Sequence, residues 1–218
     1  MVSPAVLLLA DSRLPSGGHA HSGGIEMAVA DGMVSDVDDL ELFLRGRLRT
    51  VGPVHAGFAA AGCRLADGGA DWARWDRAYS ARVLSAALRA ASRAQGAALL
   101  RTASRIWDHP ALAELRGQRL RPHQPLVLGA AVAAGRGTPA DAAALAVHHL
   151  VGGACSAAIR LLGLDPLAVA AVQGGLSDAA NHAATTGLTA TEPPATGAVL
   201  PELLAARHAQ SEVTLFAS

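Results

Sequence analysis

The sequence predicts an all-α protein, a single domain built as a bundle of about eight to ten helices with a flexible C-terminal tail. Of its 218 residues 51% are apolar but only 3% are aromatic, so Ala, Leu and Val must build the core. These residues favour helices or fill them at low entropic cost, whereas the β-branched and aromatic runs typical of strands are scarce. Helix-start signals also recur along the chain, and the segment 81–107 has a clear helical period.

Two helix starts are visible in the first third of the chain. Ser35 followed by Asp38 resembles a capping box, which opens a helix that runs through Leu48. Pro53 then restarts the chain into a smaller helix over residues 54–65. We therefore expect two successive helices in this region.

The segment 81–107 gives the strongest periodic signal. Asp71 caps a short helical segment before it, and Pro110 follows its end, where the residue before a proline leaves the α region. Apolar and small residues at spacings of three and four predict an amphipathic helix of about seven turns. The stripe consists of Leu84, Leu88, Ala91, Gln95, Leu99, Thr102 and Ile106.

Proline also marks the helices of the second half. Pro125 opens an apolar helix over 126–134, and Thr138 caps a long apolar helix that we expect to reach Leu162. Asp165 and the following proline start a further helix towards Ala184.

The long apolar helix carries three notable features. Gly152 and Gly153 leave little bulk on it, so we expect another backbone to come close there. His148 and His149 are adjacent and point about 100° apart, which makes shared chelation of one ion difficult. Arg160 lies in an apolar stretch and should either find a partner or lead out to a surface, because an unpaired buried charge is costly.

The composition changes near residue 187, where Thr, Pro, Gly and Ala replace the core-forming pattern. We therefore divide the chain into a helical domain, residues 1–187, and a linker with a C-terminal tail, residues 188–218.

Composition excludes several classes of function. The net charge is zero, so no basic face indicates a nucleic acid. All 18 basic residues are arginine. P-loop nucleotide-binding proteins, Schiff-base enzymes and protein kinases each require a lysine, so these three classes are excluded. Cys63 and Cys155 are far apart and indicate buried thiols in a reducing cytosol. The chain contains no unbroken run of about 18 apolar residues, so we expect no membrane span.

The Gly-rich segment, Leu14–Glu26, is the most unusual part of the chain, with four glycines, two serines and two histidines ahead of a helical pattern. Three interpretations of it stay open. Free backbone N–H groups could bind an anion, His19 and His21 could share a metal ion, or the glycines could shape turns for packing or for a partner. A hydrolase built on Ser16 or Ser22 lacks the usual nucleophile elbow.

Several motifs, in order, resemble the UreF family of urease accessory proteins over essentially the whole chain. The Gly-rich segment supplies L-P-S-G-G and S-G-G-I-E, and A-D-G-M-V follows at residues 30–34. The middle of the chain contributes L-R-A-A-S and P-L-V-L-G, and the end contributes R-H and L-F-A-S. No single motif is specific, but their order makes chance unlikely.

The resemblance implies a cytoplasmic, non-enzymatic scaffold without a cofactor, an all-α homodimer that recruits the GTPase UreG and UreH (also called UreD) and helps deliver nickel to apo-urease. It implies neither nucleic-acid nor membrane binding. A nickel-binding metallochaperone with His19 and His21 as ligands is the alternative. By position, the UreG side would be Pro15, Gly17, Gly18, Ser22, Gly24 and Glu26, and the UreH side Arg207, His208, Leu215, Phe216 and Ser218.

Overall fold

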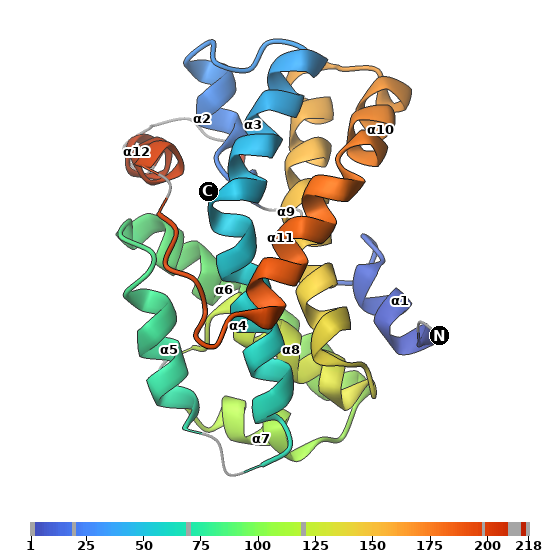
Figure 1. Cartoon of the computed structure of the whole chain (residues 1–218), viewed down its shortest axis with the longest axis vertical. Helices are drawn as coiled ribbons and strands as arrows, with labels where there is room; N and C mark the ends of the chain where they lie inside the picture. Colours follow the sequence, from blue (N-terminus) through green and yellow to red (C-terminus); the bar gives the residue numbers. More distant parts are fainter. Residues whose placement is uncertain are drawn as a thin grey trace.

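A computed structural model describes residues 3–18, 21–68, 71–118, 121–197, 199–208 and 215–216, with the backbone alone for residues 200, 201, 206 and 208. These residues contain twelve helices and no strand, which confirms the predicted all-α class (Figure 1). In order they are α1 Pro4–Ala10, α2 Ile25–Ala30, α3 Val37–Arg49, α4 Val51–Leu65, α5 Trp72–Ser80, α6 Ala86–Ile106, α7 Pro110–Arg116, α8 Gln124–Ala134, α9 Pro139–Leu162, α10 Pro166–Gly175, α11 Ser177–Thr189 and α12 Val199–His208.

The described helices exceed the eight to ten predicted from the sequence. The short helices α1 and α7 account for part of the difference. The helix predicted from Asp165 towards Ala184 is in fact two, because the chain turns at Leu176 between α10 and α11. The C-terminal segment also contains α12, whose leucines were not assigned to a helix.

Helix α4 runs through the middle of the molecule and packs against α8, α9 and α11 (Figure 1). The core around these helices consists mainly of Ala, Leu and Val, as the composition predicts. Phe58 on α4 is fully buried and packs edge to face with Tyr79 and Trp75 from α5. Three of the few aromatic residues therefore pack together between α4 and α5.

Glycines let α4 and α8 cross at close range. A Cβ atom on Gly129 would lie 2.1 Å from the carbonyl oxygen of Ala59, and one on Gly62 would lie 2.6 Å from that of Leu126. Both distances are far below van der Waals contact, so no larger residue fits either position. The crossing depends on the absence of two side chains.

The close approach predicted at Gly152 and Gly153 is wrong. A Cβ on Gly153 would meet no atom within 4 Å, and one on Gly152 would reach only Gln173, at 3.8 Å. Both glycines instead line an internal cavity. Small residues on one helix leave space beside it. The positions of the neighbouring helices decide whether another backbone occupies that space or it stays open as a cavity.

Two predicted helix starts are displaced. The N-cap of α3 is Asp36, whose side chain accepts a hydrogen bond from the backbone N–H of Asp39 at 2.9 Å, and not Ser35 paired with Asp38. Ser35 instead donates its hydroxyl to the Asp39 carboxylate at 2.8 Å. Helix α4 begins two residues before Pro53, which therefore lies in its first turn, a position that tolerates proline.

Helix α6 begins at Ala86, later than predicted, because Ser85 caps it and residues 81–85 are a turn followed by irregular chain. Leu84 therefore lies outside the helix and is 79% exposed. Within the predicted stripe, Leu88, Ala91 and Gln95 line a partly open cavity, whereas Leu99 is buried. The rest of the buried face of α6 is formed by the neighbouring positions Gly96, Leu100 and Ala103. The period was correct, but the surface it faces is only partly core.

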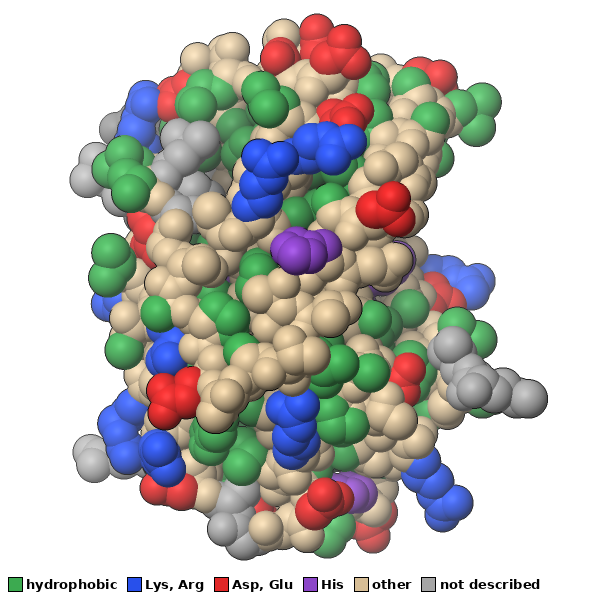
Figure 2. All heavy atoms as spheres, in the orientation of Figure 1, with side chains coloured by type: hydrophobic (Ala, Val, Ile, Leu, Met, Phe, Trp, Pro, Cys, Tyr) green, Lys and Arg blue, Asp and Glu red, His purple; other side chains and the backbone are tan. Residues whose placement is uncertain are grey.

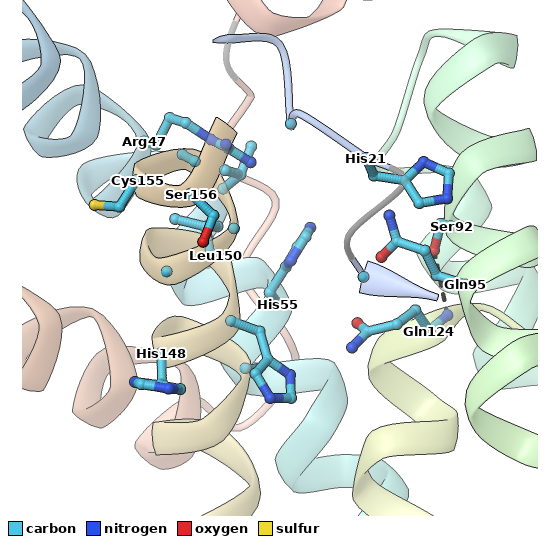
Figure 3. A pocket seen from close by; sticks show the side chains of 18 of the residues that line it. His21, Arg47, His55, Ser92, Gln95, Gln124, His148, Leu150, Cys155 and Ser156 are labelled. Atoms are coloured by element: carbon cyan, nitrogen blue, oxygen red, sulfur yellow. Dashed lines mark hydrogen bonds between the residues drawn. The ribbon is translucent and has the colours of Figure 1, made fainter. Parts of the chain in front are cut away.

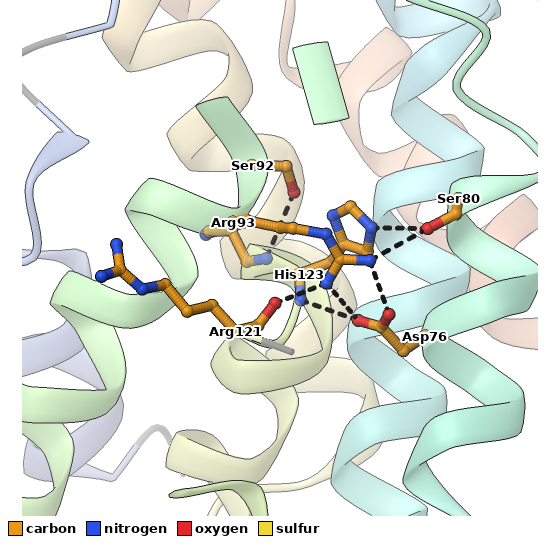
Figure 4. A network of polar contacts seen from close by, with 7 residues as sticks. Asp76, Ser80, Ser92, Arg93, Arg121 and His123 are labelled. Carbon is orange, nitrogen blue, oxygen red and sulfur yellow. Dashed lines mark hydrogen bonds and ion pairs between the residues drawn. The ribbon is translucent and has the colours of Figure 1, made fainter. Parts of the chain in front are cut away.

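A buried polar network ties α5 and α6 to the segment before α8 (Figure 4). Arg93 of α6 forms an ion pair with Asp76 of α5 at 2.7 Å. The ring Nε2 of His123 lies 2.9 Å from the Ser80 hydroxyl, and the His123 backbone N–H donates to Asp76 at 3.2 Å. His123 is fully buried, and burial lowers its pKa to about 4, so its ring is neutral and braces the fold.

By length and composition alone, α9 could cross a membrane. It does not stand out in the sequence, because its apolar residues do not form an unbroken run. However, 61% of its most apolar window is buried, against α4, α8 and α11 among others. This is the position of a core helix. On the face in Figure 2, acidic and basic side chains are interspersed over the outer helices.

Candidate functional site

The first half of the Gly-rich segment rests on α6. The hydroxyl of Thr102 donates to the carbonyl oxygen of Pro15 at 2.7 Å. Gly17 has a left-handed φ of +79°, and a Cβ there would lie 3.0 Å from the Cβ of Ala98. Both features fix the path of the chain, whereas Gly18 is exposed.

The second half turns inward and starts α2. Ser22 is fully buried, and Gly23 and Gly24 have φ values of +64° and +93°. A Cβ on Gly23 would lie 2.4 Å from the guanidinium of Arg47 on α3. These glycines therefore allow left-handed turns and a close approach, which supports the turn-shaping interpretation of the segment.

Glu26, at the start of α2, binds the end of the chain. Its carboxylate accepts hydrogen bonds from the backbone N–H of Leu215 at 2.5 Å and of Phe216 at 3.2 Å. The ring of Phe216 is buried, and the guanidinium of Arg160 on α9 lies 4.4 Å from its centroid. Arg160 is exposed and also contacts this ring, so both alternatives predicted for it apply.

Helix α12 provides the other contacts of the C-terminal tail. Arg207 forms an ion pair with Asp31, which follows α2. Leu204 is buried, and the carboxylate of Glu202 accepts hydrogen bonds from two backbone N–H groups, those of Leu84 and Ser85, just before α6. The tail helix therefore links α2 to the start of α6.

The two predicted sets of partner-binding residues meet at one place. Glu26, assigned to the UreG side, contacts Leu215 and Phe216, assigned to the UreH side. Ser22 and Gly24 are buried and would act through the shape of the segment. The side chain of His208, and all of Ser218 and His19, lie outside the described residues.

His21 is half-buried, and burial lowers its pKa. Among the described residues no three His, Cys, Asp or Glu side chains converge in a way that could hold a metal ion. Because His19 lies outside the described part of the chain, the predicted pair of histidine ligands stays a prediction. His21 lines the edge of a cavity, a position that depends on how distant helices pack and that the sequence did not predict.

That cavity has a volume of about 560 Å³ and lies between α9 and the pair α6 and α8, beside the Gly-rich segment (Figure 3). His55 of α4 projects into it and forms a hydrogen bond of 3.1 Å with the hydroxyl of Tyr79. Burial lowers the pKa of His55 to about 4 and raises that of Tyr79 to about 12, so both groups are neutral. Sequence reasoning treated His55 as ordinary, and no local pattern marks it.

Fold and site together define an all-α protein in which a Gly-rich segment and the C-terminal tail meet beside an internal cavity. The UreF family model matches residues 34–177 of the chain. The urease accessory protein UreF of Mycolicibacterium vanbaalenii is 42% identical over 213 residues, which cover 98% of this chain and 97% of that protein. The UreF proteins of Mycobacterium marinum and Mycobacterium tuberculosis are 41% and 42% identical over 224 residues, the full length of both chains in each pair. The chain therefore belongs to the UreF family of urease accessory proteins.

Proposed function

We propose that this protein is a cytoplasmic, non-catalytic scaffold of urease maturation. As a homodimer, it recruits the GTPase UreG and the accessory protein UreH (UreD), and the complex delivers nickel to apo-urease. Full-length similarity to urease accessory proteins supports the general role. The partners follow from the resemblance in sequence motifs.

The meeting of the Gly-rich segment and the C-terminal tail is the observation that carries the proposal. Around it, Leu215 is 77% exposed, and Val199 and Leu203 of α12 are also exposed. These exposed apolar side chains support a binding role for this part of the surface. In this proposal UreG and UreH bind adjoining surfaces, with Glu26 at their boundary.

Co-expression with tagged UreH and with UreG, followed by size-exclusion chromatography with light scattering, tests the proposal. We expect the wild-type chain to elute as part of a complex and, alone, as a dimer. Deletion of residues 206–218 should leave a folded dimer that no longer retains UreH. If wild type forms no complex in any nucleotide state, the scaffold role is wrong.

A matched pair of variants locates the surface. Leu215→Asp places a charge on the exposed tail side chain and should weaken UreH retention at least about tenfold. Leu167→Asp makes the same change at an 80% exposed leucine on α10 and should have no effect. Equal retention by both variants would remove the tail from the interface.

A further inference from the structure

Arg47 of α3 places an unneutralised cation in the wall of the cavity. Its Nε is buried and donates a hydrogen bond to no group in the described residues. Among these residues no carboxylate forms an ion pair with it. The face of Phe43, 5.9 Å from the guanidinium carbon, offers the only aromatic contact described for it.

The Gly-rich segment covers this guanidinium from one side. Gly23 approaches so closely that a Cβ would lie 2.4 Å from Nη1 of Arg47. Burial lowers the pKa of Arg47 to about 10, which still leaves it protonated at neutral pH. An anionic ligand would supply this half-buried charge with the counter-ion that the described residues lack.

The other charged groups of the cavity have partners of their own. The carboxylate of Asp11 pairs with Arg13 at 2.7 Å, and Glu202 accepts hydrogen bonds from backbone N–H groups before α6. Arg82 donates to the carbonyl oxygen of Pro193 at 2.9 Å. Arg160, which also lines the cavity, lies over the ring of Phe216. Arg47 thus has no oxygen partner among the described residues, and the other charged groups of the cavity do not supply one.

The wall opposite Arg47 is polar. Gln95 of α6 and Gln124 of α8 extend their carboxamides into the cavity, and Ser92 lies beside them (Figure 3). Neither carboxamide has a hydrogen bond to a described residue, whereas the Ser92 hydroxyl accepts one from the backbone N–H of Gln124 at 3.2 Å. Free amide groups across the cavity from a half-buried guanidinium can bind the polar part of a ligand.

We propose that the cavity binds a small oxyanion, with the guanidinium of Arg47 as its counter-charge and the carboxamides of Gln95 and Gln124 as hydrogen-bonding partners. The planar guanidinium fork matches a carboxylate, bicarbonate or phosphate group. A cavity of about 560 Å³ has the size of small-molecule sites, so the oxyanion can be part of a larger metabolite. This site is separate from the protein–protein contacts of the proposed scaffold.

Thermal unfolding of the full-length protein tests the site. Formate, acetate, bicarbonate and phosphate are titrated at constant ionic strength, with chloride as the balancing salt. We expect at least one oxyanion to raise Tm saturably by about 3 °C or more, because a ligand that binds only the folded state stabilises it. The responding anions distinguish a trigonal from a tetrahedral ligand. A Tm that does not change with any of the four overturns the proposal.

Arg47→Met should abolish this response, while Arg49→Met, an exposed arginine two residues away, should keep it. An equal response in both variants contradicts the proposal. If Arg47→Met does not fold, Gln95→Leu replaces it as a test, because it leaves the charge in place and removes an amide partner. We then expect at least about a threefold weaker Kd by calorimetry, and an unchanged Kd overturns the site.

Discussion

The guanidinium of Arg160 lies over the ring of Phe216, 4.4 Å from its centroid, and so joins the end of α9 to the end of the chain. Residue Phe216 is 5% exposed although its neighbour Leu215 is 77% exposed. The two adjacent side chains thus have different roles: Phe216 anchors the tail to the core, and Leu215 faces outward.

The Arg160–Phe216 pair should contribute measurably to stability. In a double-mutant cycle with Arg160→Met and Phe216→Leu, we expect a coupling free energy of about 0.5–2 kcal/mol, the range of cation–π pairs. Urea unfolding of the four proteins measures it. A coupling near zero would mean that the contact between the guanidinium and the ring does not stabilise the fold.

The carboxylate of Glu26 should control local opening of the tail. Glu26→Gln keeps the size but loses the charge that strengthens both hydrogen bonds, so we expect amide exchange at Leu215 and Phe216 to accelerate roughly tenfold. Glu41→Gln, which disturbs only a surface pair with Arg45, is the control. Hydrogen exchange followed by mass spectrometry or NMR reports both, and equal exchange in the two variants contradicts the assigned role of Glu26.

The crossing of α4 and α8 should not tolerate a methyl group. Gly129→Ala forces a Cβ against the carbonyl of Ala59, and we expect a loss of about 3 kcal/mol in the free energy of unfolding or failure to fold. Gly174→Ala on α10 meets no atom and should gain about 0.5–1 kcal/mol instead. Urea denaturation separates them, and equal effects would contradict the packing.

Stability should fall below neutral pH because the fold holds three buried or half-buried histidines in the neutral form. Burial lowers the pKa of His55, His123 and His149 from 6.5 to about 4. The unfolded chain therefore binds protons that the folded chain does not, so stability is complete above pH 6.5 and declines as pH falls from 6.5 to about 4. At pH 5.5 we expect a loss of about 1 kcal/mol for each histidine.

Urea unfolding at pH 7.5, 6.5 and 5.5 measures this decline. His149 donates its Nε2 proton to the carbonyl oxygen of Leu9 at 2.9 Å, and His149→Gln should reduce the slope by about a third while keeping a donor. His182→Gln, at an exposed position on α11, should leave the slope unchanged. A stability curve that is flat between pH 7.5 and 5.5 would contradict the burial of neutral imidazoles.

Much of the secondary structure is determined locally. Thr138 and Asp141 form the expected cap of α9, with reciprocal hydrogen bonds of 3.2 and 2.8 Å, because a cap involves only neighbouring residues. Predictions failed where local signals compete. Ser35 and Asp36 both suit an N-cap, and only the packed helix selects one. The periodicity of α6 indicated one buried face but not the cavity beside it.

The sequence by itself therefore determined the all-α class, most helix starts and, through ordered motifs, the UreF family. Tertiary structure alone decided that Glu26 meets Phe216, at a separation of 190 residues, and that Arg47 faces a cavity. The physical reason is the distance along the chain over which each kind of interaction acts. Capping and helical periods depend on residues within a turn or two, whereas contacts between distant segments depend on how all the helices pack together.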